Sequence, residues 1–84
     1  MTRERLIELL GQDIPGDWEG DNAYQGLQIL RKYTANLICG ADHDIIYSEN
    51  IDQLIKAGIT ENDCKELRRL NWMVNDDEYL ACFV

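Results

Sequence analysis

The fold is decided by the stretch Ile59-Thr60-Glu61-Asn62-Asp63-Cys64-Lys65-Glu66-Leu67-Arg68-Arg69-Leu70. Thr60 and Asp63 have the spacing of a capping box in which Asp replaces the usual Glu. Ile59 and Cys64 can close over the first turn as a hydrophobic staple. The stretch therefore predicts a helix that ends near Leu70. Its expected core face holds Cys64, Leu67 and Leu70, and its expected water face holds Lys65, Arg68 and Arg69.

A β-hairpin is predicted directly after this helix. Trp72-Met73-Val74 and Tyr79-Leu80-Ala81-Cys82-Phe83 flank the turn-forming cluster Asn75-Asp76-Asp77-Glu78. Upstream, His43-Asp44-Ile45-Ile46-Tyr47 predicts a third strand that pairs with the hairpin. We expect Trp72, Leu80 and Phe83 to share one core with Leu67 and with either the face of Ile45 and Tyr47 or the alternate face of that strand.

Three further helices are predicted from capping residues and helical spacing. They run over 3–10 after Thr2, from Asp21 or Asn22 to about Tyr33, and over 51–57 after Asn50. Gly26 inside the second helix costs about 1 kcal/mol relative to Ala unless a close contact requires glycine. The chain is therefore expected to be a single compact α+β domain over 1–84, with a small antiparallel sheet of about three strands and short helices packed on one face.

The charge of the chain is strongly acidic and unevenly distributed. There are 16 acidic and 8 basic residues, a net charge of −8, and the stretches 6–30, 33–55 and 70–84 contain no Lys or Arg. The hydrophobic fraction of 45% is too high for a disordered acidic tail. Such a domain should attract basic partners and repel nucleic acid.

The composition also indicates a compartment. No segment approaches the ~20 apolar residues of a membrane span, and 1–5 lacks the apolar region of a signal peptide. Three cysteines at irregular spacing do not form a disulfide framework. We expect a cytoplasmic protein that contacts neither membrane nor nucleic acid directly.

Metal and catalytic motifs are weak. Cys39 and His43, with Cys64 and Cys82, have the ligand types of a zinc site, but only one pair is close in sequence. The loop 13–21 has carboxylates but no bidentate Glu that matches the calcium template. His43 and Asp44 would point to opposite faces of a strand. We expect no metal, no cofactor and no catalytic residue.

Two acidic clusters are the candidate protein-binding sites, because both lie in expected loops that lack basic neighbours. Trp18, between two carboxylates, is either a core plug or an interface anchor. The first cluster ranks above the second because it combines charge with an aromatic ring. The loop cluster is Asp13, Asp17, Trp18, Glu19 and Asp21, and the hairpin-tip cluster is Asp76, Asp77 and Glu78.

The C-terminal half resembles small acidic proteins of bacteriophages and prophages. The resemblance rests on His43-Asp44-Ile45-Ile46-Tyr47, Gly58-Ile59-Thr60-Glu61-Asn62-Asp63, Leu67-x-x-Leu70-Asn71-Trp72 and Cys82-Phe83-Val84. It implies an inhibitor of host defence, such as an anti-CRISPR, anti-restriction or glycosylase-inhibitor protein. It carries no catalytic residue over to this chain.

The sequence leads to one function hypothesis and several alternatives. A non-enzymatic binding protein could occupy a basic nucleic-acid-binding surface of a host or defence protein, since such clefts carry the Lys and Arg that neutralise phosphates. The main alternative is a small interaction or regulatory domain whose acidity only serves solubility. A small enzyme and a metal-binding protein are the remaining classes.

Overall fold

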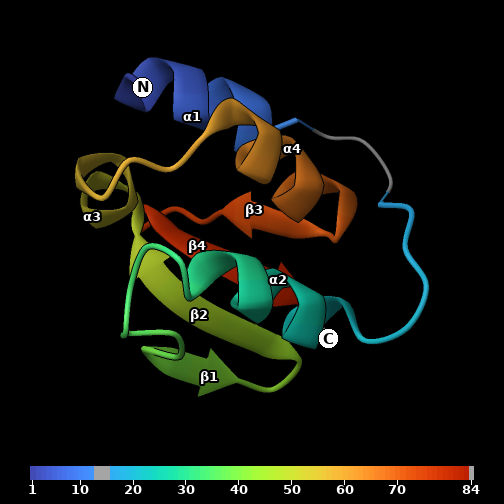
Figure 1. The fold of residues 1–84 in the computed structure, drawn as a ribbon. Helices are drawn as coiled ribbons and strands as arrows, with labels where there is room; N and C mark the ends of the chain where they lie inside the picture. The colour runs from blue at the N-terminus through green and yellow to red at the C-terminus, as the bar shows by residue number, and fades with distance from the viewer. Residues whose placement is uncertain (13–15, 84) are drawn as a thin grey trace.

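Four helices and four strands, all within the described residues 1–12 and 16–83, make up the computed structural model of the chain (Figure 1). In chain order they are α1 (Arg3–Leu10), α2 (Asn22–Leu30), β1 (Gly40–Asp42), β2 (Ile45–Asn50), α3 (Ile51–Lys56), α4 (Glu61–Arg69), β3 (Trp72–Val74) and β4 (Tyr79–Phe83). The strands form one antiparallel sheet in the order β1-β2-β4-β3. The predicted α+β class is confirmed, with β1 as a fourth strand. No helix of the described part could cross a membrane.

The helix starts follow the predicted caps. Thr2, Asn50 and Thr60 each accept, through a side-chain oxygen, a hydrogen bond from the backbone N–H three residues on, at 3.1, 2.9 and 3.2 Å. Each cap satisfies one of the N–H groups that the first turn of a helix leaves without a partner. These local signals therefore place α1, α3 and α4.

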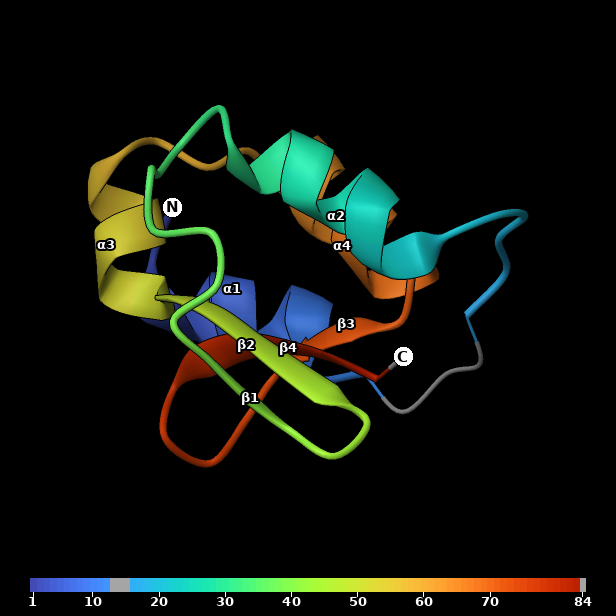
Figure 2. The same ribbon diagram turned by 90° about the horizontal axis from the view of Figure 1, so that it is seen from below.

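The helices pack against one face of the sheet. In Figure 2 they lie above and behind the strands, and the lower face of the sheet carries none of them. The core between the layers is closed by Trp72 of β3 and Leu80 of β4, both fully buried, together with Leu67 of α4. The indole Nε1 of Trp72 donates to the carbonyl of Asn22 at 3.2 Å. Gly26 of α2 lies against this ring, so a close contact does require glycine there.

Two expectations about the strands need correction, and one that was left open is decided. His43 has a φ of 50° and lies in the β1–β2 turn, so β2 begins at Ile45 and continues to Asn50. Of the two faces left open for this strand, the alternate one packs against the core, through Ile46. Phe83 is 42% exposed and lies outside the core, because it pairs with Ile45 on the face away from the helices.

Two expectations about the helices also change. The second helix ends at Leu30 rather than near Tyr33. Arg68, expected to face water, is buried, and its Nε donates to the carbonyl of Gln12 at 2.7 Å. The long side chain reaches the segment that follows α1, which puts its apolar stem in the core and gives its guanidinium a backbone acceptor.

A buried carboxylate fastens the segment that leads into β1. Glu49 accepts hydrogen bonds from the backbone N–H of Asn50 (2.9 Å), the hydroxyl of Thr34 (2.9 Å) and the amide of Asn36 (3.3 Å). Burial alone would raise the pKa of Glu49, but these three donors hold it below its ordinary value. The charged carboxylate thus joins the end of β2 to residues 34–36.

Candidate protein-binding surface

The sheet has one covered and one uncovered face, and strand register assigns residues to each. Paired residues of neighbouring strands point to the same side. Ile45 pairs with Phe83, and Tyr47 and Met73 each pair with Ala81, so these five residues share the side opposite the helices. Ala81 is buried, whereas the other four are at least partly exposed. We call this set the open sheet face; it borders a hollow of about 370 Å³.

Basic residues are confined to the helical layer. All eight lie in helices or within two residues of a helix end, and none lies in a strand or in a turn between strands. They are Arg3, Arg5, Arg31, Lys32, Lys56, Lys65, Arg68 and Arg69. Every strand comes from the basic-free stretches 33–55 and 70–84. The open sheet face therefore belongs to a layer that has carboxylates and no cation of its own.

Ion pairs add to the difference in charge between the two layers. Arg3 joins Asp52 of α3, Arg5 joins Glu61 of α4 at 2.8 Å, and Lys32 joins Asp63 at 2.7 Å. These pairs neutralise acids on the helical side. At the turns of the sheet, by contrast, no ion pair involves Asp44, Asp76 or Asp77 within the described part of the chain. Figure 2 shows the two turns projecting at either end of the uncovered face.

The hairpin-tip cluster divides into one structural and two exposed acids. Glu78 has a φ of 65° and pairs with Arg3, so it holds the turn against α1. Asp76 and Asp77 are exposed. The turn is held by Asn75, whose Oδ1 accepts hydrogen bonds from the backbone N–H groups of Asp77 (3.0 Å) and Tyr79 (2.9 Å).

The loop cluster is also only partly available for binding. Asp13 lies outside the described residues. Asp21 caps α2 by accepting a hydrogen bond from the N–H of Tyr24 at 3.1 Å. The backbone of Asp17 is bound on both sides by Arg69, through its N–H at 2.9 Å and its carbonyl at 2.5 Å. Glu19 is exposed, and its carbonyl accepts from the Gln25 amide at 2.6 Å.

Trp18 is a surface residue that packs locally. Its ring lies on Gly16, where an added Cβ would approach the ring carbon Cζ3 to 2.4 Å. The residue is 36% exposed and does not belong to the core cluster. Trp18 therefore is not a core plug, and the interface-anchor interpretation stays a prediction. Figures 1 and 2 place this loop and the hairpin tip at opposite ends of the molecule, so the structure does not bring the two clusters together.

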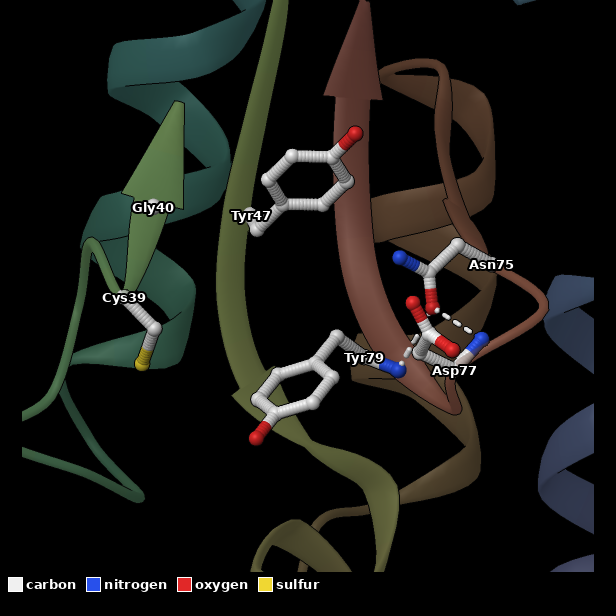
Figure 3. A pocket seen from close by; sticks show the side chains of 6 residues that line it. All are labelled: Cys39, Gly40, Tyr47, Asn75, Asp77 and Tyr79. Atoms are coloured by element: carbon white, nitrogen blue, oxygen red, sulfur yellow. Dashed lines mark hydrogen bonds between the residues drawn. The ribbon is translucent and has the colours of Figure 1, made fainter. Parts of the chain in front are cut away.

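The sequence interpretation missed two tyrosines beside the hairpin tip. Tyr47 of β2 and Tyr79 of β4 line a cavity of about 230 Å³ together with Asp77 (Figure 3). The hairpin tip therefore combines charge with aromatic rings, a property that the sequence assigned only to the loop. One signal was present: 45–47 and 79–83 are apolar at consecutive positions, whereas a strand with one face in water should alternate.

Cysteine and histidine side chains do not gather into a site. Cys64 and Cys82 are buried in the core, and burial raises the pKa of each thiol to about 11. Cys39 is exposed, and His43, 91% exposed in the β1–β2 turn, lies 3.5 Å from Asp42. In the described part of the chain no three His, Cys, Asp or Glu side chains are placed to hold a metal ion.

The comparisons with known proteins leave this surface as the guide to function. No protein-family model, curated protein or solved structure matches the chain. Function is therefore inferred from the geometry and charge of the open sheet face and its turns.

Proposed function

We propose that this chain is a non-enzymatic acidic binding protein whose open sheet face docks on a basic surface of another protein. The observation that carries the proposal is the separation of charge between the layers. The helical layer contains every basic residue, while the sheet presents apolar side chains between acidic turns. A basic surface with some apolar content complements that arrangement.

The apolar part of the face supports a protein partner. Exposed, contiguous apolar patches on a small domain mark interaction sites. The open sheet face contains Tyr47, Met73 and the 42% exposed Phe83, which are residue types enriched in interfaces. Burying such side chains would supply affinity, whereas the carboxylates at the turns would orient the partner and speed association.

The charge supports a partner that normally binds nucleic acid. Clefts for DNA or RNA carry Lys and Arg that neutralise phosphates, and an acidic protein surface can occupy the same residues. The resemblance of the C-terminal half to phage proteins fits an inhibitor of this kind, acting in the host cytoplasm. The alternative remains a small interaction domain whose acidity serves only to keep it in solution.

A second candidate surface is the loop around Trp18. The observation that favours this surface is that Trp18 is partly exposed, while Arg69 binds the backbone of the preceding residue, Asp17. Asp17 and Glu19 would then supply the charge. Asp21 is better left unchanged in tests of this surface, because it caps α2 and its loss would cost about 1 kcal/mol of stability.

The test is capture of host proteins on the immobilised chain. It compares two pairs of variants that make similar substitutions at different places on the surface. Phe83→Ala and Asp76→Lys alter the open sheet face and its turn. Tyr24→Ala and Glu4→Lys make the same kinds of change on exposed residues of the helical layer. We expect a nucleic-acid-binding protein to be retained at low salt, released as salt rises, and displaced by added DNA or RNA.

The variants decide between the surfaces. The first pair should abolish or strongly weaken retention of that protein, and the second pair should leave it unchanged. Loss of retention with Trp18→Ala or Asp17→Lys, but not with Phe83→Ala, would move the site to the loop. Retention that is independent of salt and equal in all variants would contradict the proposal.

A further inference from the structure

The cavity at the hairpin tip has the composition of a site for a cation. Its walls are the rings of Tyr47 and Tyr79, the Asp77 carboxylate, the Asn75 side chain and the segment 39–40. Figure 3 shows the two rings over the neighbouring strands β2 and β4, with Asp77 next to the backbone of Tyr79. None of the lining residues is basic, so the cavity has no internal counterion.

The turn that carries Asp77 and Tyr79 is held in place before any ligand arrives. Besides the two bonds that Asn75 accepts through its side chain, its N–H donates to the Tyr79 carbonyl at 2.9 Å and its carbonyl accepts from Glu78 at 3.0 Å. The pairing of β2 with β4 shifts register between Tyr47 and Asn50, next to the cavity. A site whose parts are already ordered loses little conformational entropy on binding.

We propose that this cavity receives an arginine side chain of the partner protein. The inference rests on the proposed function, because it assumes that a basic protein docks on the open sheet face. Aromatic faces attract cations, and a neighbouring carboxylate adds a charge-assisted hydrogen bond. Arginine fits better than lysine because its planar guanidinium can stack on a tyrosine ring and still donate two parallel hydrogen bonds to Asp77.

The position of the cavity gives the arginine a defined role. It lies at the end of the open sheet face, next to the hollow that Tyr47 and Asp77 also line. An arginine held there would fix the register of a partner segment whose apolar side chains lie along Met73 and Phe83. Arginine and tyrosine are among the residue types that contribute most to the binding energy of protein interfaces.

The test uses the ¹⁵N-labelled full chain and N-acetyl-arginine amide, followed by NMR. We expect chemical-shift changes centred on the amides of Tyr47, Asp77 and Tyr79. The neutral analogue N-acetyl-citrulline amide should bind at least about fivefold more weakly, and the corresponding lysine amide should also bind more weakly than arginine. Asp77→Asn and Tyr79→Leu should each reduce the affinity for arginine about fivefold or more.

The matched control is Asp76→Asn. It removes the same charge from the same turn, but Asp76 does not line this cavity, so its affinity for arginine should stay within about twofold of the wild type. Equal affinity for citrulline, or an Asp77→Asn protein that binds arginine like the wild type, would overturn the inference. Asp77→Asn keeps the backbone N–H that Asn75 binds, so this variant remains informative if Tyr79→Leu does not fold.

The small probe also separates this inference from the proposed function. Failure to bind arginine, combined with loss of protein capture by Phe83→Ala, would refute the arginine site and leave the docking face intact. Arginine binding with the predicted variant pattern, combined with capture that no open-face variant affects, would support the cavity and refute docking on the face as a whole.

Discussion

Gly26→Ala should destabilise the protein, although alanine is the better helix former. Gly26 lies inside α2, and Trp72 is fully buried beneath it. A Cβ at position 26 would lie 2.0 Å from the indole Nε1 and 2.4 Å from Cε2. The helix backbone cannot shift by that distance, so the buried indole ring has to move. That movement costs free energy, because the ring is closely packed.

The magnitude follows from three opposing effects. Alanine in place of glycine favours the helix by about 1 kcal/mol. Overpacking a well-filled core costs roughly 1–3 kcal/mol, and displacement of the indole weakens its hydrogen bond to Asn22, which contributes about 0.5–1.5 kcal/mol. The free energy of unfolding should therefore fall by about 0.5–3.5 kcal/mol, and the Tm by at least about 2 °C for a domain of this size.

Urea denaturation followed by tryptophan fluorescence and far-UV circular dichroism measures this change. Gly40→Ala is the matched control, because its Cβ would meet only Tyr47 Cδ2 at 3.6 Å and its φ is not positive. It should change stability by less than about 1 kcal/mol. A Gly26→Ala protein as stable as the wild type would refute the reasoning. A double-mutant cycle with Trp72→Phe should show coupling, since the smaller ring leaves room for the methyl group.

Three other changes test the remainder of the structure. In the native protein an alkylating reagent should modify Cys39 alone, whereas denaturant should expose Cys64 and Cys82 as well; intact-mass measurement of three native adducts, or of a zinc adduct, would contradict this. Glu49→Gln should lower stability by about 1–3 kcal/mol at pH 7. The folded-state pKa of Glu49 is lowered, so its carboxylate contributes to the free energy of unfolding above the ordinary pKa of 4.5, and this contribution is lost as pH falls through the lowered pKa. The free energies of unfolding of the wild type and of Glu49→Gln should therefore become equal in acid. Leu67→Ala, at a fully buried position, should cost about 2–5 kcal/mol by urea denaturation, and a cost below 1 kcal/mol would contradict the core described above.

Local signals in the sequence were sufficient for most of the fold. The caps at Thr2, Asn50 and Thr60 depend on residues three positions apart, so the sequence alone contains them. The hairpin at 72–83 is equally local. By contrast, Gly40-Ala41-Asp42 has little intrinsic strand preference and becomes β1 because β2 offers it hydrogen-bond partners.

The facing of residues could not be predicted because it depends on the tertiary structure. The strand 45–47 is apolar at every position, so nothing local decides whether Ile45 or Ile46 meets the helices. The candidate site has the same limitation. Glu78 of the hairpin-tip cluster is ion-paired with Arg3, which is 75 positions away in sequence. Tyr47 and Asp77 line one cavity only because β2 pairs with β4.

The separation of charge also predicts how a partner would approach. The chain has a net charge of −8, and its cations are confined to the helical layer, where Arg3, Arg5, Lys32 and Arg69 are among those that form ion pairs with acids. A basic partner should therefore be steered toward the sheet side, and added salt should slow its association. On the proposed function, Asp76→Lys should act mainly on the association rate. Phe83→Ala should act mainly on the dissociation rate, because its ring contributes only after contact is made. Kinetics that show the reverse assignment would mean that the acids, rather than the apolar side chains, form the buried centre of the interface.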